Sequence, residues 1–307
     1  MRNALVTGGH GFIGRHLVRA LRQRGFNVYT LGRRETDGAR HFTLEGAAWT
    51  ADTLADIIQT AAPGYIFHLA GAMHGTAEEL DRVNVGMTKT LLRALENTLL
   101  RPLLIIAGSA AEYGSAIKDG EPIEETLACA PLSDYGMSKH RQTSEALNYA
   151  STTGNPVLVA RIFNPLGCDM PAHLAIADFA RQLAAMEQNS GKLCVGNIDV
   201  RRDMIDVEHI ATLLCRLAEN PAARGTVNIC SGQAPLLRDL VEMLIGNFGK
   251  KVDFKIDQVR LRRNELKTLI GSTRLLSSLG CTPPVTDFPA VIARISRSAR
   301  EGMAHPS

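Results

Sequence analysis

The first 25 residues limit the possible folds more than any other part of the chain. Residues 3–7 are a short apolar run, Gly8, Gly11 and Gly14 follow, and apolar residues then recur at helical spacing as far as Gly25. This order predicts a strand, a glycine turn and a helix. The first glycine can take a tight turn, the second lets a phosphate approach the backbone, and the third allows close helix–strand packing. A diphosphate would lie at the positive N-terminal end of that helix.

The spacing GxxGxxG differs from the dinucleotide fingerprint GxGxxG, and three glycines alone also fit a purely structural turn. The position of this turn between the first strand and the first helix favours a nucleotide site. We therefore predict that the turn and the start of the helix contact a bound dinucleotide. The predicted contacts are Gly8, Gly11, Phe12, Ile13 and Gly14.

The composition excludes several classes of protein. The chain has 307 residues, 45% of them hydrophobic, which is typical of a globular protein large enough for two lobes. A net charge of +3 is too small to indicate nucleic-acid binding. No run of 18 apolar residues predicts a membrane-spanning helix, so we expect no membrane partner. The six cysteines lack metal-binding spacing and the N-terminus does not resemble a signal peptide, so we expect reduced thiols, no metal and a cytoplasmic location.

Predicted strands alternate with predicted helices along most of the chain. The strands are 27–31, 65–71, 102–107, 157–161 and 226–230, and the helices include 53–62, 78–99, 208–218 and 235–247. Such alternation implies an α/β fold with a parallel sheet covered by helices on both faces. Ligands of such folds bind beyond the carboxyl ends of the strands, and Ser109 falls at such an end.

The end of the second strand bears on the choice of cofactor. An acidic residue there would accept a hydrogen bond from the ribose 2′-hydroxyl of NAD, whereas Arg33 and Arg34 suit the 2′-phosphate of NADP. The alternative to a phosphate site is that Arg33 and Arg34 are a solvated pair on the surface. Asp52 could cap the next helix or face the adenine. His68 lies in an apolar run, and we predict that it is packed and hydrogen-bonded rather than catalytic.

A tyrosine and a lysine share one face of a predicted helix that begins near Ser133. Tyr135 and Lys139 are four residues apart, so they are neighbours on the helix surface. A lysine ammonium near a phenol lowers the tyrosine pKa and lets the phenol exchange a proton near neutral pH. The hydroxyl of Ser109 could hold the carbonyl oxygen of a ketone being reduced. The alternative for such a pair taken alone is that both side chains lie on the surface and have no catalytic role.

The order of motifs resembles the extended branch of the short-chain dehydrogenase/reductases, the NAD-dependent epimerase/dehydratase family. These motifs are GxxGxxG, HLAG at 68–71, a serine before Glu-Tyr-Gly at 112–114, and YxxxK at 135–139. The resemblance implies a Rossmann-like doubly wound parallel sheet in residues 1–163 and a smaller C-terminal α/β substrate lobe in 164–307, with segments near 200–220 returning to the first lobe. It also implies a homodimer formed through the helices that carry Asn84 and Tyr135.

The same resemblance assigns roles to individual residues. Ser109, Tyr135 and Lys139 would be the catalytic set, with Lys139 also holding the nicotinamide ribose. Asn84 matches a position near the cofactor. The other expected cofactor contacts are Leu69, Ala70, Gly71 and Ile162, and the expected cofactor is NADP, with NAD possible.

The extended branch acts mostly on nucleotide-diphosphate sugars, and the late segments point to one group within it. Residues 260–272 resemble a segment of the GDP-4-keto-6-deoxy-mannose reductases and of the related GDP-mannose dehydratases. Arg202 and Arg262 are diphosphate candidates, because guanidinium groups pair with phosphate oxygens. Asn164 would contact the nucleotide sugar, or hydrogen-bond locally in a turn. The remaining substrate candidates are His74, Ser109, Ala110 and Glu265.

Several activities stay open at this point. The dehydratases resembled here carry Thr-x-Glu ahead of the tyrosine turn, and Glu112 stands one residue too late for that pattern. A 3,5-epimerase would need a further acid–base pair, for which Cys168, His173 and His74 are candidates. A 4-epimerase or 4,6-dehydratase with tightly bound NAD would also match the motifs, and so would a non-catalytic sensor that binds NADP. We favour reduction of a nucleotide-linked 4-keto-6-deoxy sugar, GDP-linked in the first instance.

Overall fold

A seven-stranded parallel sheet forms the centre of the molecule. The computed structural model describes residues 2–34, 39–44, 46–261 and 266–304. The strand order is β12-β7-β5-β4-β1-β2-β3, and every neighbouring pair is parallel. The strands are β1 (Arg2–Thr7), β2 (Phe26–Gly32), β3 (Arg40–Thr43), β4 (Tyr65–His68), β5 (Leu103–Ser109), β7 (Val157–Ile162) and β12 (Gly225–Ile229). The predicted Rossmann-like doubly wound α/β fold is confirmed.

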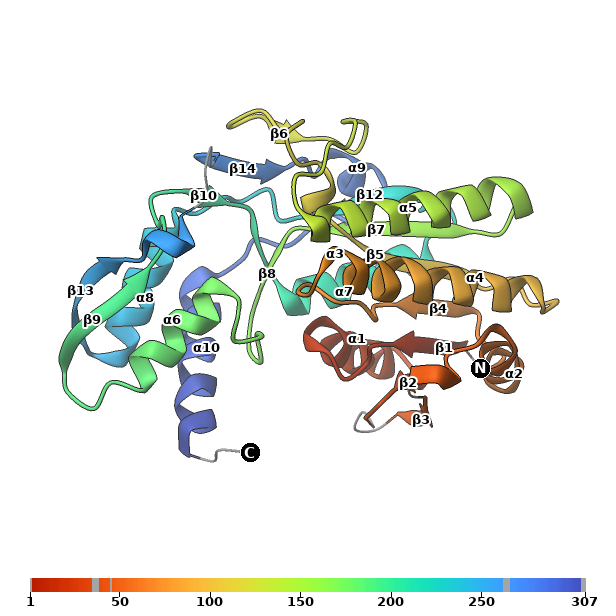
Figure 1. The fold of residues 1–307 in the computed structure, drawn as a ribbon, viewed down its shortest axis with the longest axis horizontal. Helices are drawn as coiled ribbons and strands as arrows, with labels where there is room; N and C mark the ends of the chain where they lie inside the picture. The colour runs from red at the N-terminus through yellow and green to blue at the C-terminus, as the bar shows by residue number, and fades with distance from the viewer. Residues whose placement is uncertain (1, 35–38, 45, 262–265, 305–307) are drawn as a thin grey trace.

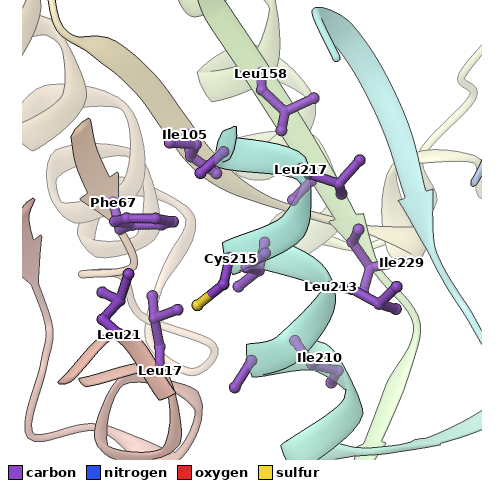
Figure 2. Close-up of a cluster of buried hydrophobic side chains, with 14 of the residues drawn as sticks. Leu17, Leu21, Phe67, Ile105, Leu158, Ile210, Leu213, Cys215, Leu217 and Ile229 are labelled. Atoms are coloured by element: carbon purple, nitrogen blue, oxygen red, sulfur yellow. The ribbon is translucent and has the colours of Figure 1, made fainter. Parts of the chain in front are cut away.

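Helices cover both faces of this sheet (Figure 1). They are α1 (Phe12–Gln23), α2 (Ala51–Ala61), α4 (Met87–Glu96), α5 (Asp134–Thr153) and α7 (Val207–Glu219). Side chains of a strand alternate between its two faces, so Val6 joins the core under α1 and α7 while Leu5 joins the core under α2 and α4. Figure 2 shows the first core, where Leu17 of α1 and Ile210 of α7 lie among side chains of the sheet.

Two predicted elements differ from those observed. The strand predicted over 65–71 ends at His68, level with the end of β1 at Thr7. The helix predicted over 78–99 is divided into α3 (Ala77–Leu80), a π-helical turn (Asp81–Gly86) and α4. Wider turns of this kind often mark functional sites, and this one carries Asn84.

A second group of elements lies beyond the sheet on the left of Figure 1. Its helices are α6 (Ala175–Ala184), α8 (Leu237–Phe248) and α10 (Phe288–Ala304), and they share a core with the parallel pair β9 (Ser190–Val195) and β13 (Lys251–Ile256). The shorter elements are η1 (Gly46–Ala48), η3 (Ala110–Glu112), β6 (Pro122–Ile123), β8 (Asn164–Leu166), β10 (Arg201–Arg202), β11 (Met204–Asp206), η4 (Gln258–Arg260), β14 (Thr268–Gly271) and α9 (Arg274–Ser278). Among the described residues, none of the helices is both long and apolar enough to cross a bilayer.

Candidate active site

The glycine turn is packed too tightly for larger side chains. Gly8 has a φ of +72°, and a Cβ there would lie 2.8 Å from the amide nitrogen of Ala70. A Cβ on Gly14 would lie 2.1 Å from the carbonyl oxygen of Gly8. Gly11 is the N-cap of α1, and neither a side-chain cap nor an acidic residue occupies the first turn. The amide groups at the start of α1, including those of Phe12 and Ile13, are therefore suited to an anion.

Two exposed arginines stand at the carboxyl end of β2, next to this turn. The amide of Gly8 donates to the carbonyl oxygen of Leu31 (3.3 Å), which places the end of β2 beside the turn. Arg33 and Arg34 follow and are exposed. Asp52 is also exposed, but the prediction that it could cap α2 is wrong. Thr50 is the N-cap, and its hydroxyl accepts from the amide of Thr53 (3.3 Å).

Ser109 and Tyr135 meet at the carboxyl end of β5. Ser109 is the last residue of that strand, and its side chain hydrogen-bonds the side chain of Tyr135. Tyr135 lies in the first turn of α5, which begins where the Ser133 hydroxyl accepts from the amide of Gly136 (3.0 Å). Lys139 follows one turn later and is only 5% exposed. The structure thus gathers the three predicted catalytic residues around one end of β5 and one face of α5.

The prediction that Lys139 lowers the pKa of Tyr135 is wrong for this arrangement. Burial raises the pKa of Tyr135 above its usual value, opposed by the hydrogen bond from Ser109. The Lys139 ammonium donates instead to Oε1 of Gln142. Burial lowers the pKa of Lys139 to about 8, although the charge of Glu112 favours the ammonium. Tyr135 is therefore held as a protonated phenol, the form that can donate a proton.

Both carboxylate oxygens of Glu112 have hydrogen-bond partners within the protein. Its carboxylate accepts from the amide of Ser109 (2.8 Å) and from Nε of Arg161 (3.0 Å), and it is completely buried. Ala110, a predicted substrate contact, is buried in the same short turn. One potential ligand atom each of Glu112, Cys129 and His140 lie within 4.8 Å of one another. Because Arg161 and Ser109 already use the carboxylate, we do not assign a metal to this group.

Asn84 holds the loop after β4. Its Oδ1 accepts from the amide of Ala72 (2.8 Å), and its Nδ2 donates to the Ala72 carbonyl (2.9 Å) and to the hydroxyl of Ser138 (2.9 Å). A Cβ on Gly71 would lie 2.9 Å from that Oδ1. These bonds give Asn84 a structural role within the protein, and its predicted place near the cofactor stays a prediction. The loop it fixes carries the other predicted contacts, Leu69, Ala70 and Gly71.

A chain of buried hydrogen bonds runs from Lys139 to the strand before the glycine turn. Gln142 accepts a hydrogen bond from the Lys139 ammonium through Oε1 and donates through Nε2 to the hydroxyl of Thr88 (2.8 Å). His68 contacts Thr88 through Nε2 (3.1 Å) and Thr7 through Nδ1 (2.8 Å). Burial, reinforced by the charge of Lys139, lowers the pKa of His68 to about 3. The prediction of a packed, hydrogen-bonded histidine is confirmed. We call these five residues the Lys139–Thr7 path.

Sequence reasoning missed Thr88 and Gln142. The only available signal for Gln142 was its position three residues after Lys139 on the same helix face. Thr88 gave no signal, since its contacts join segments far apart in the chain. Ile162, a predicted cofactor contact, is buried at the end of β7 and pairs in register with Ser109 of β5.

The predicted substrate residues divide into several groups. Asn164 begins β8 and donates through Nδ2 to the carbonyl oxygen of Asp203 (2.7 Å), 39 residues further along the chain, so the alternative of a local hydrogen bond in a turn is wrong. Arg202 donates to the carbonyl oxygens of Arg201 (2.9 Å) and Leu266 (3.0 Å). Arg262 and Glu265 lie outside the described residues.

Two of the three candidate epimerase residues come together. The rings of His74 and His173 are perpendicular, with centroids 4.3 Å apart, and both side chains are exposed. Burial and the charge of His74 lower the pKa of His173. Cys168 lies instead beside Arg294, and its backbone hydrogen-bonds His16. Burial raises the pKa of the Cys168 thiol, which disfavours the thiolate that a base would require.

Several proteins similar to this chain are named as sugar-nucleotide enzymes. The GDP-6-deoxy-D-mannose reductase of Pseudomonas aeruginosa is 33% identical over 290 residues, 92% of either chain. The GDP-6-deoxy-D-talose 4-dehydrogenase of Aggregatibacter actinomycetemcomitans is 26% identical over 96% of this chain and 97% of its own. The solved structure of RMD from Pseudomonas aeruginosa complexed with NADPH superposes with a TM-score of 0.81 at 28% identity, covering 97% of this chain and 99% of that one.

A family match covers most of the chain. Residues 4–230 match the family described as the NAD dependent epimerase/dehydratase family. This span includes the glycine turn, Ser109, Tyr135 and Lys139. The enzyme class predicted from the sequence is confirmed, and the chain belongs to the NAD dependent epimerase/dehydratase family.

Proposed function

We propose that this chain is an NADP-dependent reductase of a nucleotide-diphosphate 4-keto-6-deoxy sugar, with a GDP-linked sugar favoured. The observation that carries the proposal is the contact of Ser109 with Tyr135 at the carboxyl end of β5, beside the buried Lys139. The 33% identity to a GDP-6-deoxy-D-mannose reductase supports the choice of sugar. The likeness to a reductase structure with bound NADPH supports the choice of cofactor.

The residues of the first lobe fit a dinucleotide. The uncapped start of α1 and the glycine turn would receive its diphosphate. Arg33 and Arg34, exposed and adjacent to the turn, would receive the 2′-phosphate. Lys139 would hold the nicotinamide ribose. When bound, the reduced nicotinamide supplies the hydride that reduces a ketone.

The reaction assigns distinct tasks to two hydroxyl groups. Ser109 donates a hydrogen bond to the C4 carbonyl oxygen of the sugar and positions it. Tyr135 gives its phenolic proton to that oxygen as it becomes an alcohol. Burial favours the protonated phenol, which suits a proton donor in the direction of reduction. Arg202 and Arg262 remain the candidates for the sugar diphosphate, and Asn164 remains a candidate sugar contact that hydrogen-bonds Asp203, the residue after Arg202.

A dehydratase fits the site less well, because it needs a free carboxylate base. Glu112, three residues after Ser109, is the acidic residue nearest to that serine in the sequence. Its carboxylate is paired with Arg161 and is not free to act as a base. A 4-epimerase with tightly bound NAD is the second candidate. An epimerase reoxidises its own cofactor and can retain it, whereas a reductase must exchange it at each turnover.

Two further proposals concern organisation. We place the boundary of the dinucleotide lobe near residue 163, with α7 and β12 returning to it, since α7 packs in the core under α1 and β12 pairs with β7. We also propose a homodimer formed through the helices that carry Asn84 and Tyr135.

The decisive experiment is a turnover screen. Purified protein is mixed with NADPH or NADH and with GDP-, UDP- or dTDP-linked 4-keto-6-deoxy sugars, and absorbance of the reduced cofactor is followed. We expect consumption of NADPH with the GDP-linked sugar. Tyr135→Phe should bind NADPH normally and lose at least about a hundredfold in turnover. Full turnover by Tyr135→Phe would refute the assignment, and cofactor released only on denaturation would favour the epimerase.

A further inference from the structure

The charge of Lys139 determines the direction of the first bonds in the Lys139–Thr7 path. An ammonium group only donates, so Gln142 must present Oε1 to it and Nε2 to Thr88. The Thr88 hydroxyl gives its single proton to the carbonyl oxygen of Asn84 (2.8 Å). Thr88 can therefore only accept from its other neighbours, which are Gln142 and His68.

The remaining directions follow from this one. Because Thr88 accepts, His68 must donate through Nε2 and is the Nε2–H tautomer. Its Nδ1 then accepts the proton of the Thr7 hydroxyl. The Thr7 oxygen in turn accepts from the amide of Ala70 (3.2 Å). This amide is the group that a Cβ on Gly8 would meet at 2.8 Å, so the path ends against the glycine turn.

Every member of the path is shielded from water. Thr7, His68, Thr88 and Gln142 are fully buried, and Lys139 nearly so. A buried polar group without a partner costs free energy, so removing one member leaves its neighbours unsatisfied. A carboxylate at position 142 would neutralise the ammonium. A glutamine orients the ammonium and leaves its charge for another group.

We propose that Gln142 is a positioning residue that orients the Lys139 ammonium and couples it, through Thr88 and His68, to the turn that receives the dinucleotide. The lysine and the glycine turn then form one hydrogen-bonded unit, although they belong to α5 and to the β1–α1 connection. The inference rests on the proposed function in taking Lys139 as a cofactor-binding lysine. The hydrogen-bond directions themselves do not depend on it.

The first test examines these directions in the protein without cofactor. Nitrogen-15 NMR of the histidine rings reports the tautomer, and His68→Gln identifies the signals of that ring. We expect the Nε2–H tautomer in the wild type and a changed tautomer in Thr88→Val. Thr143→Val is the matched control, because the Thr143 hydroxyl is equally buried and has no hydrogen-bond partner among the described residues. An Nδ1–H tautomer in the wild type would overturn the proposal.

The second test examines positioning. We expect Gln142→Leu to raise the NADPH dissociation constant about tenfold, the typical effect of losing a hydrogen bond to a charged group. Gln142→Glu keeps an acceptor for Lys139, but its carboxylate neutralises the ammonium and cannot donate to Thr88. A folded Gln142→Glu should therefore also bind NADPH about tenfold more weakly than the wild type, whereas a merely structural role would leave its affinity unchanged. Thr143→Val should bind as the wild type does.

Each result of the binding test has a defined meaning. Equal affinity of Gln142→Leu and Thr143→Val would refute the positioning role. If Gln142→Leu does not fold, Thr88→Val takes its place, since it breaks the path one bond further from Lys139, and it too must weaken binding. Failure of the wild type to bind NADPH would count against the proposed function. The tautomer measurement would then be the remaining test of the hydrogen-bond directions.

Discussion

Acid should destabilise this protein through one buried histidine. His68 is fully buried, and its pKa lies at about 3 in the folded chain against 6.5 when exposed. As the pH falls below 6.5, His68 binds a proton in the unfolded chain but not in the folded chain, so the free energy of unfolding decreases. Above pH 6.5 both states are neutral at this site and the effect vanishes. At pH 5 the loss from His68 amounts to about 2 kcal/mol, at roughly 1.4 kcal/mol for each pH unit.

The assay compares urea unfolding of the wild type and His68→Gln from pH 5 to pH 8.5. Glutamine can still donate and accept a hydrogen bond but does not titrate. Between pH 7.5 and 8.5 the difference between the two proteins should be constant, which provides an internal control for any general destabilisation by the substitution. Below pH 6.5 the wild type should lose about 2 kcal/mol more than the variant. Parallel pH profiles for the two proteins would show that His68 is not held neutral, and the reasoning would fail.

Three further variants test other parts of the site. Gly14→Ala places a Cβ 2.1 Å from a carbonyl oxygen of the glycine turn, and we expect unfolding to become easier by about 1–3 kcal/mol and NADPH binding to be lost. Alanine at both Arg33 and Arg34 should weaken NADPH binding at least about tenfold and leave NADH binding unchanged, as measured by titration of cofactor fluorescence. Glu112→Gln leaves the buried Arg161 guanidinium without its carboxylate, and denaturant unfolding should show a loss of about 3–5 kcal/mol.

Two surface variants serve as controls for these losses. Gly246→Ala lies in α8, where a Cβ meets nothing within 4 Å, and it should stabilise the chain by about 0.5–1 kcal/mol. Glu121→Gln breaks an exposed ion pair with Lys118 and should change stability by less than about 1 kcal/mol. If Glu112→Gln costs no more than Glu121→Gln, the buried ion pair is not the structural element we take it for.

Features set by neighbouring residues could be predicted from the sequence, whereas contacts between distant segments could not. Apolar periodicity predicted the sheet and its helices, because strand and helix patterns repeat over neighbouring residues. The spacing of Tyr135 and Lys139 put them on one helix face for the same reason. Thr50, rather than Asp52, caps α2, a choice between adjacent residues that depends on the local backbone. The pKa of Tyr135 could not be predicted, since its direction is decided by burial.

Buried polar groups on the central strands also narrow the choice of chemistry. β4 and β5 are neighbours, and His68 at the end of β4 and Glu112 just beyond β5 are two buried titratable groups near Lys139 and Ser109. Both are enclosed: His68 hydrogen-bonds through each ring nitrogen, and Glu112 through each carboxylate oxygen. Neither can take a proton from a substrate without breaking the structure that supports Lys139 or Ser109. Of these groups, Tyr135 is half-buried and in contact with Ser109, so it is the one placed to move a proton, which supports the proposed reduction.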